Sequence, residues 1–205
     1  MRGMRRRLLL LVLLLAAAAG PAAAAASAPA WTTHRSASNG FQIAAPATWI
    51  DVTRLTPQVL AKLKQTPALA GYLAAIQRTH AIKLVLADAG PLTLTNHYAI
   101  SCNVAQVPAI GDLRLARDLT VAELKGTGLV QGAVHASYVR LPGGKAVELR
   151  YQERVGATSP TVLLDQFILV RNGQATAVSY ATLTKLAATE RPVFLRSIRS
   201  FRFTA

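Results

Sequence analysis

The sequence predicts an α+β protein in which an antiparallel β-sheet is flanked by helices on both faces. The first observation is a series of four apolar segments between Val134 and Thr182. Short turns join these segments, as in a β-meander. The second is the helical spacing of apolar residues before and after this series. The third is length, because residues 31–205 suffice to bury a core without disulfides, and Cys102 is the only cysteine.

The last two segments of the meander are predicted to form a hairpin around Asn172 and Gly173. Asn-Gly between apolar runs is a strong hairpin signal, because both residues tolerate the positive φ of a type I′ turn. The segment Val162–Val170 is apolar on both faces, so we predict a central strand that is covered on both sides. A two-residue loop gives four facing pairs: Arg171 with Gln174, Leu169 with Thr176, Phe167 with Val178, and Asp165 with Tyr180.

The first hairpin of the meander turns at residues 142–144, which are Pro-Gly-Gly. Apolar and polar residues alternate in the strand that follows, so this strand is predicted to have one face in solvent. The apolar set is Val147, Leu149 and Tyr151, and the polar set is Glu148, Arg150, Gln152 and Arg154. Loops of two and of four residues both remain open, and the faces are the same for both. The apolar set faces Val134, Ala136 and Tyr138, and the polar set faces His135 and Ser137.

Residues 1–30 have the organisation of a secretory signal peptide. Four arginines precede an unbroken run of twelve apolar residues from Leu8 to Ala19. A permanent membrane-spanning helix needs about 20 apolar residues, so this run is too short for an anchor. Cleavage after Ala26 and after Ala30 both fit the small-residue rule, and the general secretory and twin-arginine routes both stay open. No cysteine stands directly after the apolar run, so we expect no lipoprotein anchor.

Residues 31–205 are predicted to form a single, strongly basic domain in the periplasm or outside the cell. The first 30 residues contain four of the 23 basic residues and none of the nine acidic ones, which leaves 19 against 9 and a formal charge of +10. Such an excess favours anionic partners such as lipid headgroups or wall polymers. It also arises from composition alone, and it then only keeps the protein soluble.

The beginning of the domain is predicted to be a β-hairpin that two helices follow. A turn at residues 38–40 separates a first strand from an alternating strand that runs from Phe41 to Val52, where Pro46 marks an edge or an exit. Thr-Pro pairs at residues 56–57 and 66–67 each predict a helix start, because threonine caps the N-terminus and proline suits the first turn.

Two more strands are predicted before the meander, at Ile82–Ala87 and Tyr98–Val107, with a loop at residues 88–97. In the second strand, Cys102 shares a face with Tyr98, Ile100 and Val104. We therefore expect a buried and inert thiol, because a reactive cysteine needs an exposed and positively charged environment.

A helix is predicted on each side of the meander, at Leu113–Lys125 with Asp112 as its N-cap, and at Glu190–Ser200. Leu115, Leu119 and Ala122 are apolar and have helical spacing in the earlier helix. In the last helix Phe194, Leu195, Ile198 and Phe201 face inward, and Arg196 and Arg199 face outward. The predicted core is Trp49, Leu73, Val147, Leu149, Tyr151, Phe167, Ile168, Leu169, Val178, Phe194 and Ile198.

The sequence contains no recognisable catalytic or cofactor motif. It has no nucleophile elbow, phosphate-binding loop or zinc-protease helix, and its histidines (His34, His80, His97 and His135) lack metal-ligand spacing. Asp165 is the one carboxylate within an apolar strand, and a structural hydrogen bond to Tyr180 or to an arginine is favoured over catalysis. We therefore expect no enzymatic activity, no metal and no cofactor. A hydrolase whose site is assembled across the fold is the less favoured alternative.

The two ends of the domain resemble those of PsbP-like domains. Residues 39–49 form a strand that ends in Pro-x-x-Trp, and residues 166–173, 180–182 and 191–201 resemble the end of these domains. This superfamily includes the photosystem II extrinsic protein PsbP, a Ran-binding nuclear-import factor and LpqN-type bacterial lipoproteins. The resemblance implies an α/β/α sandwich with adaptor or assembly roles, and it brings no catalytic residues. The chain departs from the lipoproteins in lacking their anchoring cysteine, and residues 56–79 make a long link between strands.

The expected function is non-catalytic binding of a protein partner, by a monomer, in the cell envelope or outside the cell. The alternative is electrostatic binding of anionic envelope polymers or lipid headgroups, for which the candidate residues are Arg140, Lys145, Arg150 and Arg154. Glu148 partly neutralises this face. Nucleic acid is not expected, because no basic strand is rich in aromatic residues and an exported protein meets few intracellular partners.

Overall fold

A computed structural model describes residues 30–54, 80–90, 96, 98, 100–154 and 159–204. The predicted signal peptide up to residue 29, both predicted Thr-Pro helices, predicted core residue Leu73 and most of the predicted loop at 88–97 lie outside these residues. Within the described ranges, no helix has the length and apolar character needed to cross a membrane.

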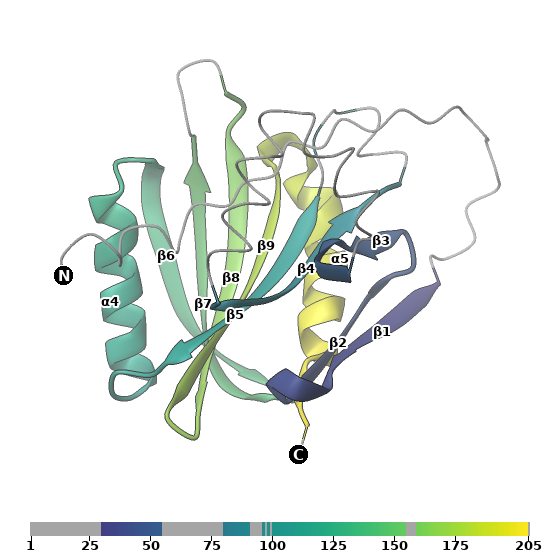
Figure 1. The fold of residues 1–205 in the computed structure, drawn as a ribbon. Coiled ribbons are helices and arrows are strands. Elements are labelled where there is room, and N and C mark those ends of the chain that lie inside the picture. Colours follow the sequence, from purple (N-terminus) through teal and green to yellow (C-terminus); the bar gives the residue numbers. More distant parts are fainter. Residues whose placement is uncertain are drawn as a thin grey trace.

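The main sheet of the described residues is antiparallel and has seven strands in the order β3-β4-β5-β9-β8-β7-β6. Each strand of the meander therefore lies beside its neighbour in the sequence (Figure 1). The predicted central strand is confirmed, because β8 pairs with β7 on one side and β9 on the other. The strands are β3 (Trp49–Asp51), β4 (Ile82–Asp88), β5 (Ser101–Pro108), β6 (Val130–Leu141), β7 (Gly144–Glu153), β8 (Val162–Arg171) and β9 (Gln174–Leu183).

The two turns of the meander fix its register. Asn172 and Gly173 have φ values of 52° and 70°, the positive values that a type I′ turn requires. All four predicted pairs between β8 and β9 are confirmed. In the first hairpin Leu141 faces Gly144, so the loop has two residues and the four-residue alternative is wrong.

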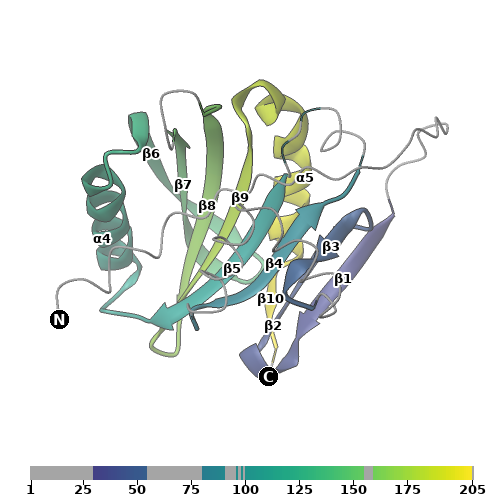
Figure 2. The same cartoon turned by 45° about the horizontal axis from the view of Figure 1, so that its top comes forward.

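Helices α4 (Leu113–Gly126) and α5 (Ala187–Ser200) cover opposite faces of the main sheet (Figure 2). Successive residues of β8 show this arrangement. Phe167 lies in one apolar cluster with Phe194 of α5, and Ile168 lies in the other cluster with Leu124 of α4. Every predicted core residue within the described ranges is buried. The sandwich of a sheet between helices is therefore confirmed.

A second, smaller sheet was not predicted. It consists of β1 (Trp31–Ser36), β2 (Phe41–Pro46) and β10 (Arg202–Phe203), all antiparallel. The first hairpin is confirmed, but the predicted continuation of its second strand to Val52 is wrong. Strand β2 ends at Pro46, which cannot donate a backbone hydrogen bond, and the chain then enters β3 of the main sheet.

Two serines of α5 attach the small sheet to the helix. The Ser197 hydroxyl donates to the backbone oxygen of Ala44 over 2.6 Å, and the backbone N–H of Ala44 donates to the Ser200 hydroxyl over 2.7 Å. Ser197 is fully buried, so these bonds satisfy polar groups that water does not reach. Helix α5 is thus in contact with both sheets.

The apolar residues that predicted α4 by their spacing do not form its buried side. Leu115 and Leu119 are 41% and 47% exposed, and Ala122 is exposed as well. The buried side chain is Leu124, and Leu113, Ala116 and Val121 pack partly against the sheet. Because α4 has apolar residues on two sides, its periodicity alone does not identify the buried side. The predicted N-cap is confirmed, since the Asp112 carboxylate accepts from the backbone N–H of Leu115 over 2.9 Å.

The predicted strand from Tyr98 begins later than expected. Strand β5 starts at Ser101, so the alternation of faces does not extend back to Tyr98. Tyr98 is buried in the cluster on the α4 side, whereas Cys102 and Val104 are buried on the α5 side. The shared face of Tyr98 and Cys102 is therefore wrong, and the burial of Cys102 is confirmed.

Candidate functional site

The polar face of β7 is only partly in solvent, so the prediction of a solvent-exposed face is wrong for Glu148, whereas Arg150 and Gln152 are half-buried and Arg154 is exposed. Glu148 is 8% exposed, and Asp165, on the neighbouring strand β8, is 1% exposed. Asp165 faces Arg150 across the two strands. The two carboxylates thus lie between the sheet and the helix, because α5 packs on the same side of β8 as Asp165, while the Arg150 side chain stays 39% exposed.

Arg191 of α5 pairs with both enclosed carboxylates. Its Nη1 donates to Asp165 Oδ2 over 2.5 Å, and its Nη2 donates to Glu148 Oε1 over 2.9 Å. Arg150 Nε lies 4.0 Å from the same Asp165 oxygen. The predicted hydrogen bond of Asp165 to an arginine is therefore confirmed. These four residues, Glu148, Arg150, Asp165 and Arg191, are called the buried ion cluster below.

The buried ion cluster combines two guanidinium groups with two carboxyl groups. Together these neighbours and burial set the pKa of Asp165 at about 7: burial raises the pKa most, Arg191 lowers it, Glu148 raises it and Arg150 lowers it.

A depression of about 550 Å³ lies against α5 beside this cluster and is called the α5 depression. Its lining combines four arginines with four apolar residues. They are Arg150, Arg191, Arg196 and Arg199, together with Ala187, Ala188, Pro192 and Leu195. Seven of these eight residues belong to α5 and recur at spacings of three and four, so one face of the helix forms most of the depression.

Arg196 and Arg199 differ from the other arginines of the depression. Neither has a carboxylate within 4.0 Å among the residues that the structure describes. The Arg196 guanidinium lies 4.2 Å from the ring centroid of Trp31, which holds it over an aromatic face of β1. Both side chains therefore keep guanidinium N–H groups for another molecule.

The predicted anion-binding residues do not form one surface. Arg140 faces Lys145 at the tip of the β6-β7 hairpin, on the side of α4. There the Lys145 Nζ and the Arg117 guanidinium lie 5.2 Å and 5.4 Å from the ring centroid of Tyr138. Arg150 belongs instead to the α5 depression.

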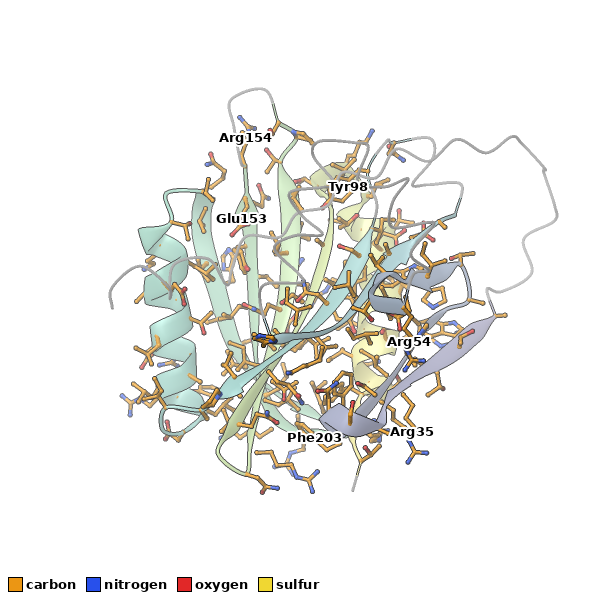
Figure 3. The ribbon with its side chains drawn as sticks, viewed as in Figure 1. Arg35, Arg54, Tyr98, Glu153, Arg154 and Phe203 are labelled. Carbon is orange, nitrogen blue, oxygen red and sulfur yellow. The ribbon has the colours of Figure 1, made fainter. Side chains whose placement is uncertain are left out.

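Arg154 lies at the other end of β7 from the hairpin tip. Its Nη2 donates to Thr161 Oγ1 over 2.7 Å. Figure 3 shows Arg154 and Phe203 at opposite ends of the molecule. Arg154 directly follows the last residue of β7 and is four residues, or about 13 Å of extended chain, beyond Arg150, and it is not part of the lining of the α5 depression.

Glu153 is a buried carboxylate that the sequence analysis did not single out. Its side chain is fully buried, and neither of its oxygens has a hydrogen-bond partner among the residues that the structure describes. Burial raises the pKa of Glu153 to about 7. Burial also raises the pKa values of Tyr98 and Tyr151, and the nearby Glu153 raises them further. Glu153 lies at the Arg154 end of β7 and is not part of the α5 depression (Figure 3).

The chemistry that the α5 depression offers is recognition of anions. Guanidinium groups donate paired hydrogen bonds that match carboxylate and phosphate oxygens. In the described ranges, no three histidine, cysteine, aspartate or glutamate side chains converge as a metal site would need. Burial raises the pKa of Cys102, so this thiol stays protonated within the core.

Sequence reasoning found part of this site. The outward direction of Arg196 and Arg199 is confirmed, because both side chains are exposed. The role of Arg191 was missed, since its carboxylate partners lie 26 and 43 positions away along the chain. The available signal was the recurrence of arginine in the last helix at residues 191, 196 and 199.

Comparisons with known proteins show likeness of structure alone. No protein-family model and no curated protein matches the sequence. Cyanobacterial PsbP (CyanoP) from Synechocystis sp. PCC 6803 is similar in structure, with a TM-score of 0.53 and 14% identity over 90% of this chain and 98% of that chain. The Ran-binding protein Mog1p of Saccharomyces cerevisiae has a TM-score of 0.53 and 12% identity, over 86% and 96% of the two chains.

A third similar structure is LpqN of Mycobacterium tuberculosis, with a TM-score of 0.49 and 12% identity over 87% of each chain. The fold conclusion rests on the first two structures. They show that this chain has the fold of PsbP and Mog1p, so the predicted resemblance is confirmed at the level of fold.

Proposed function

We propose that this chain is a non-catalytic binding module that holds a partner protein by carboxylate groups seated in the α5 depression. One observation carries the proposal. Arg191 is neutralised by its own chain, whereas Arg196 and Arg199 line the same depression without a carboxylate partner among the described residues. Arginines that one helix holds side by side without counter-charges favour anionic groups of another molecule.

The apolar part of the lining favours a protein as the ligand over a polyanionic polymer. Ala187, Ala188, Pro192 and Leu195 alternate with the arginines. A peptide with acidic and apolar side chains fills such a surface, because protein interfaces combine an apolar centre with charged groups at its rim. Yeast Mog1p, which shares the fold, is by name a Ran-binding protein, and this supports a protein-binding role.

The proposal includes a location outside the cytoplasm, in the periplasm or the medium, for a chain without a lipid anchor. The support is the sequence of residues 1–30, with its arginines, apolar run and small residues. N-terminal sequencing of the protein recovered outside the cytoplasm tests this part. We expect a mature chain that begins at Ser27 or Trp31, and a chain that still begins at Met1 would contradict it.

The binding surface itself is testable by photocrosslinking in living cells. A photoreactive amino acid replaces Ala188, an exposed residue of the depression, and a matched control carries it at Ser38, an exposed residue of the turn between β1 and β2. We expect Ala188 to capture a defined protein that Ser38 does not, and Arg196→Glu with Arg199→Glu to abolish the capture. Equal capture from both positions, or capture that survives both charge reversals, would contradict the proposal.

A second candidate function is binding of anionic envelope polymers or headgroups at the hairpin tip. Tyr138 favours it, because this ring is 45% exposed between the cations of Arg117 and Lys145. This function predicts that Arg140→Glu with Lys145→Glu weakens sedimentation with purified wall polymer or anionic vesicles, while Arg196→Glu with Arg199→Glu does not. Unchanged sedimentation of the hairpin variant would exclude this candidate.

A further inference from the structure

Strand β6 is a long and exposed edge of the main sheet. It is the terminal strand of the sheet order and has twelve residues, most of them exposed. The strand at the other end of the order, β3, has only three residues and leads directly into a short 3₁₀ helix, Val52–Arg54. Short edge strands limit pairing with other chains, whereas long ones invite it. Among the described strands, β6 is therefore the edge best suited to receive another strand.

The residues of β6 do not protect this edge. Natural edge strands often carry lysines, inward charges or prolines that prevent pairing. From Val130 to Val139 the strand has no charged residue and no proline, and its single charge is Arg140 near the hairpin tip. A register shift between Gln131 and His135 affects only the first part of the strand.

The two-residue loop determines which backbone groups point outward. Leu141 and Gly144 flank the loop and form a hydrogen-bonded pair, so the residues of β6 that bond to β7 are every second residue before Leu141. The residues between them, Val134, Ala136 and Tyr138, direct their N–H and C=O groups away from β7. These groups form a regular row along the free edge.

We propose that β6 pairs antiparallel with β6 of a second copy of this chain, with the two-fold axis at Ala136. This register places Val134 opposite Tyr138 of the second copy, a β-branched residue beside an aromatic ring, which is a favourable cross-strand pair. It also places the two Arg140 side chains eight residues apart, or about 26 Å, so their charges do not oppose pairing. The proposed dimer has one continuous sheet, in contrast to the monomer expected from the sequence.

Helix α4 shows the same two-fold complementarity. A groove of about 360 Å³ runs between α4 and β6, and Asp118, Val121, Ala122 and Lys125 are part of its lining together with Ala136. In the dimer the two copies of α4 run antiparallel on one side of the joined sheet. Within one chain Asp118 pairs with Arg117 over 2.6 Å, and half of the Asp118 side chain remains exposed. With the axis at Ala136, the proposed dimer adds Lys125 of the second copy to this carboxylate, with Val121 and Ala122 between these opposite charges. This pairing of opposite charges favours a second copy over an unrelated strand.

Disulfide crosslinking tests the register of the dimer. The two Ala136 residues form a hydrogen-bonded antiparallel pair, whose Cα atoms are about 5.5 Å apart and within the range that a disulfide spans. Under mild oxidation with copper phenanthroline we expect Ala136→Cys to form a covalent dimer and the control Arg140→Cys to stay monomeric. The native Cys102 is buried and does not interfere. Absence of the crosslink from Ala136→Cys, or equal crosslinking of both variants, would overturn the proposed register.

Sedimentation equilibrium of the exported protein tests the dimer without engineered cysteines. We expect twice the monomer mass at concentrations of tens of micromolar, and weakening of at least tenfold by Asp118→Lys or Lys125→Asp alone. The double variant with both charges exchanged should recover the dimer, because opposite charges then meet again between the two copies, with their signs reversed. A single-copy mass at every concentration, a double variant as weak as the single ones, or β6 occupied by an extended segment of a different protein would each overturn the proposal.

Discussion

Arg191 of α5 donates its Nη1 hydrogen to Asp165 of β8 over 2.5 Å, and this bond joins the last helix to the centre of the main sheet. The carboxylate of Asp165 is 1% exposed, so the guanidinium is its principal compensation for lost hydration. The same arginine also binds Glu148 of β7. One side chain therefore ties the helix that lines the depression to two strands at once.

Arg191→Met is expected to destabilise the protein by about 3 kcal/mol at pH 7.5, because it removes the one ion-pair partner that Glu148 has among the described residues and leaves Asp165 with the more distant Arg150 alone. The loss should be smaller at pH 5. There Asp165, whose pKa burial raises, takes up a proton in the variant, and a neutral carboxylic acid needs no guanidinium. Urea unfolding at the two pH values measures both effects. Arg199→Met is the control, since Arg199 has no carboxylate partner among the described residues, and it should change stability by less than about 0.5 kcal/mol.

Glu153 is expected to make the protein less stable as the pH rises. Its pKa is about 7 in the folded chain against an ordinary value of 4.5. Below pH 4.5 the carboxyl is protonated in both states. Between pH 4.5 and 7 the unfolded chain releases this proton first, so stability falls, and above pH 7 the whole loss of roughly 3 kcal/mol is present.

Glu153→Gln removes this titration. The stability of the variant relative to the parent should therefore rise by roughly 3 kcal/mol between pH 4 and pH 8. The difference between the two proteins isolates Glu153, because Asp165, whose pKa is also raised, titrates in both. Thermal or urea unfolding across this range is the measurement. Parallel pH profiles for parent and variant would show that Glu153 gains a partner or water in solution.

Cys102 is expected to be unreactive in the native protein. Cys102 is fully buried, so reagents do not reach its sulfur. Burial also raises its pKa, so the thiol does not form the reactive thiolate at pH 8. Ellman's reagent should modify one thiol per chain in urea and essentially none without it on the same timescale. Rapid modification of the native chain would show that the cluster around Cys102 opens readily.

Ser197→Ala is expected to loosen the small sheet from α5. The substitution leaves the backbone oxygen of Ala44 without its 2.6 Å donor, at a cost of about 1 to 2 kcal/mol. Hydrogen exchange should speed up in β1 and β2 more than in β8. Ser137→Ala, at an exposed position of β6, is the control and should leave exchange unchanged.

Local signals in the sequence predicted most of the main sheet. Asn172 and Gly173 set the register of the last hairpin, because positive φ at both positions allows one turn type. The small sheet could not be predicted in this way, since β10 follows β2 by more than 150 residues and no turn joins them. The buried side of α4 could not be predicted from the sequence either. Leu115 and Leu124 are equally apolar, and only the position of the sheet determines which of the two is buried.

The candidate site was predictable only in part, for the same physical reason. The sequence identified Arg150 and the outward direction of Arg196 and Arg199. It did not show that α5 covers β7, and so it read Glu148 as a solvent-exposed acid when it is a partner of Arg191. Side chains that meet across a sheet and a helix have no fixed spacing in the sequence, so their pairing follows only from the fold.

The central claim is that Arg196 and Arg199 bind carboxylates of a partner protein, and the most direct test is the affinity for the protein captured from position 188. Isothermal titration calorimetry at 50 mM salt compares Arg196→Glu with Arg199→Glu against a charge-matched pair, Arg35→Glu with Arg114→Glu, at exposed positions outside the depression. Two charge-assisted contacts of about 1.5 kcal/mol each predict a loss of about 100-fold for the first pair and less than threefold for the second. Equal losses for both pairs would show that net charge alone governs binding, and they would contradict the claim.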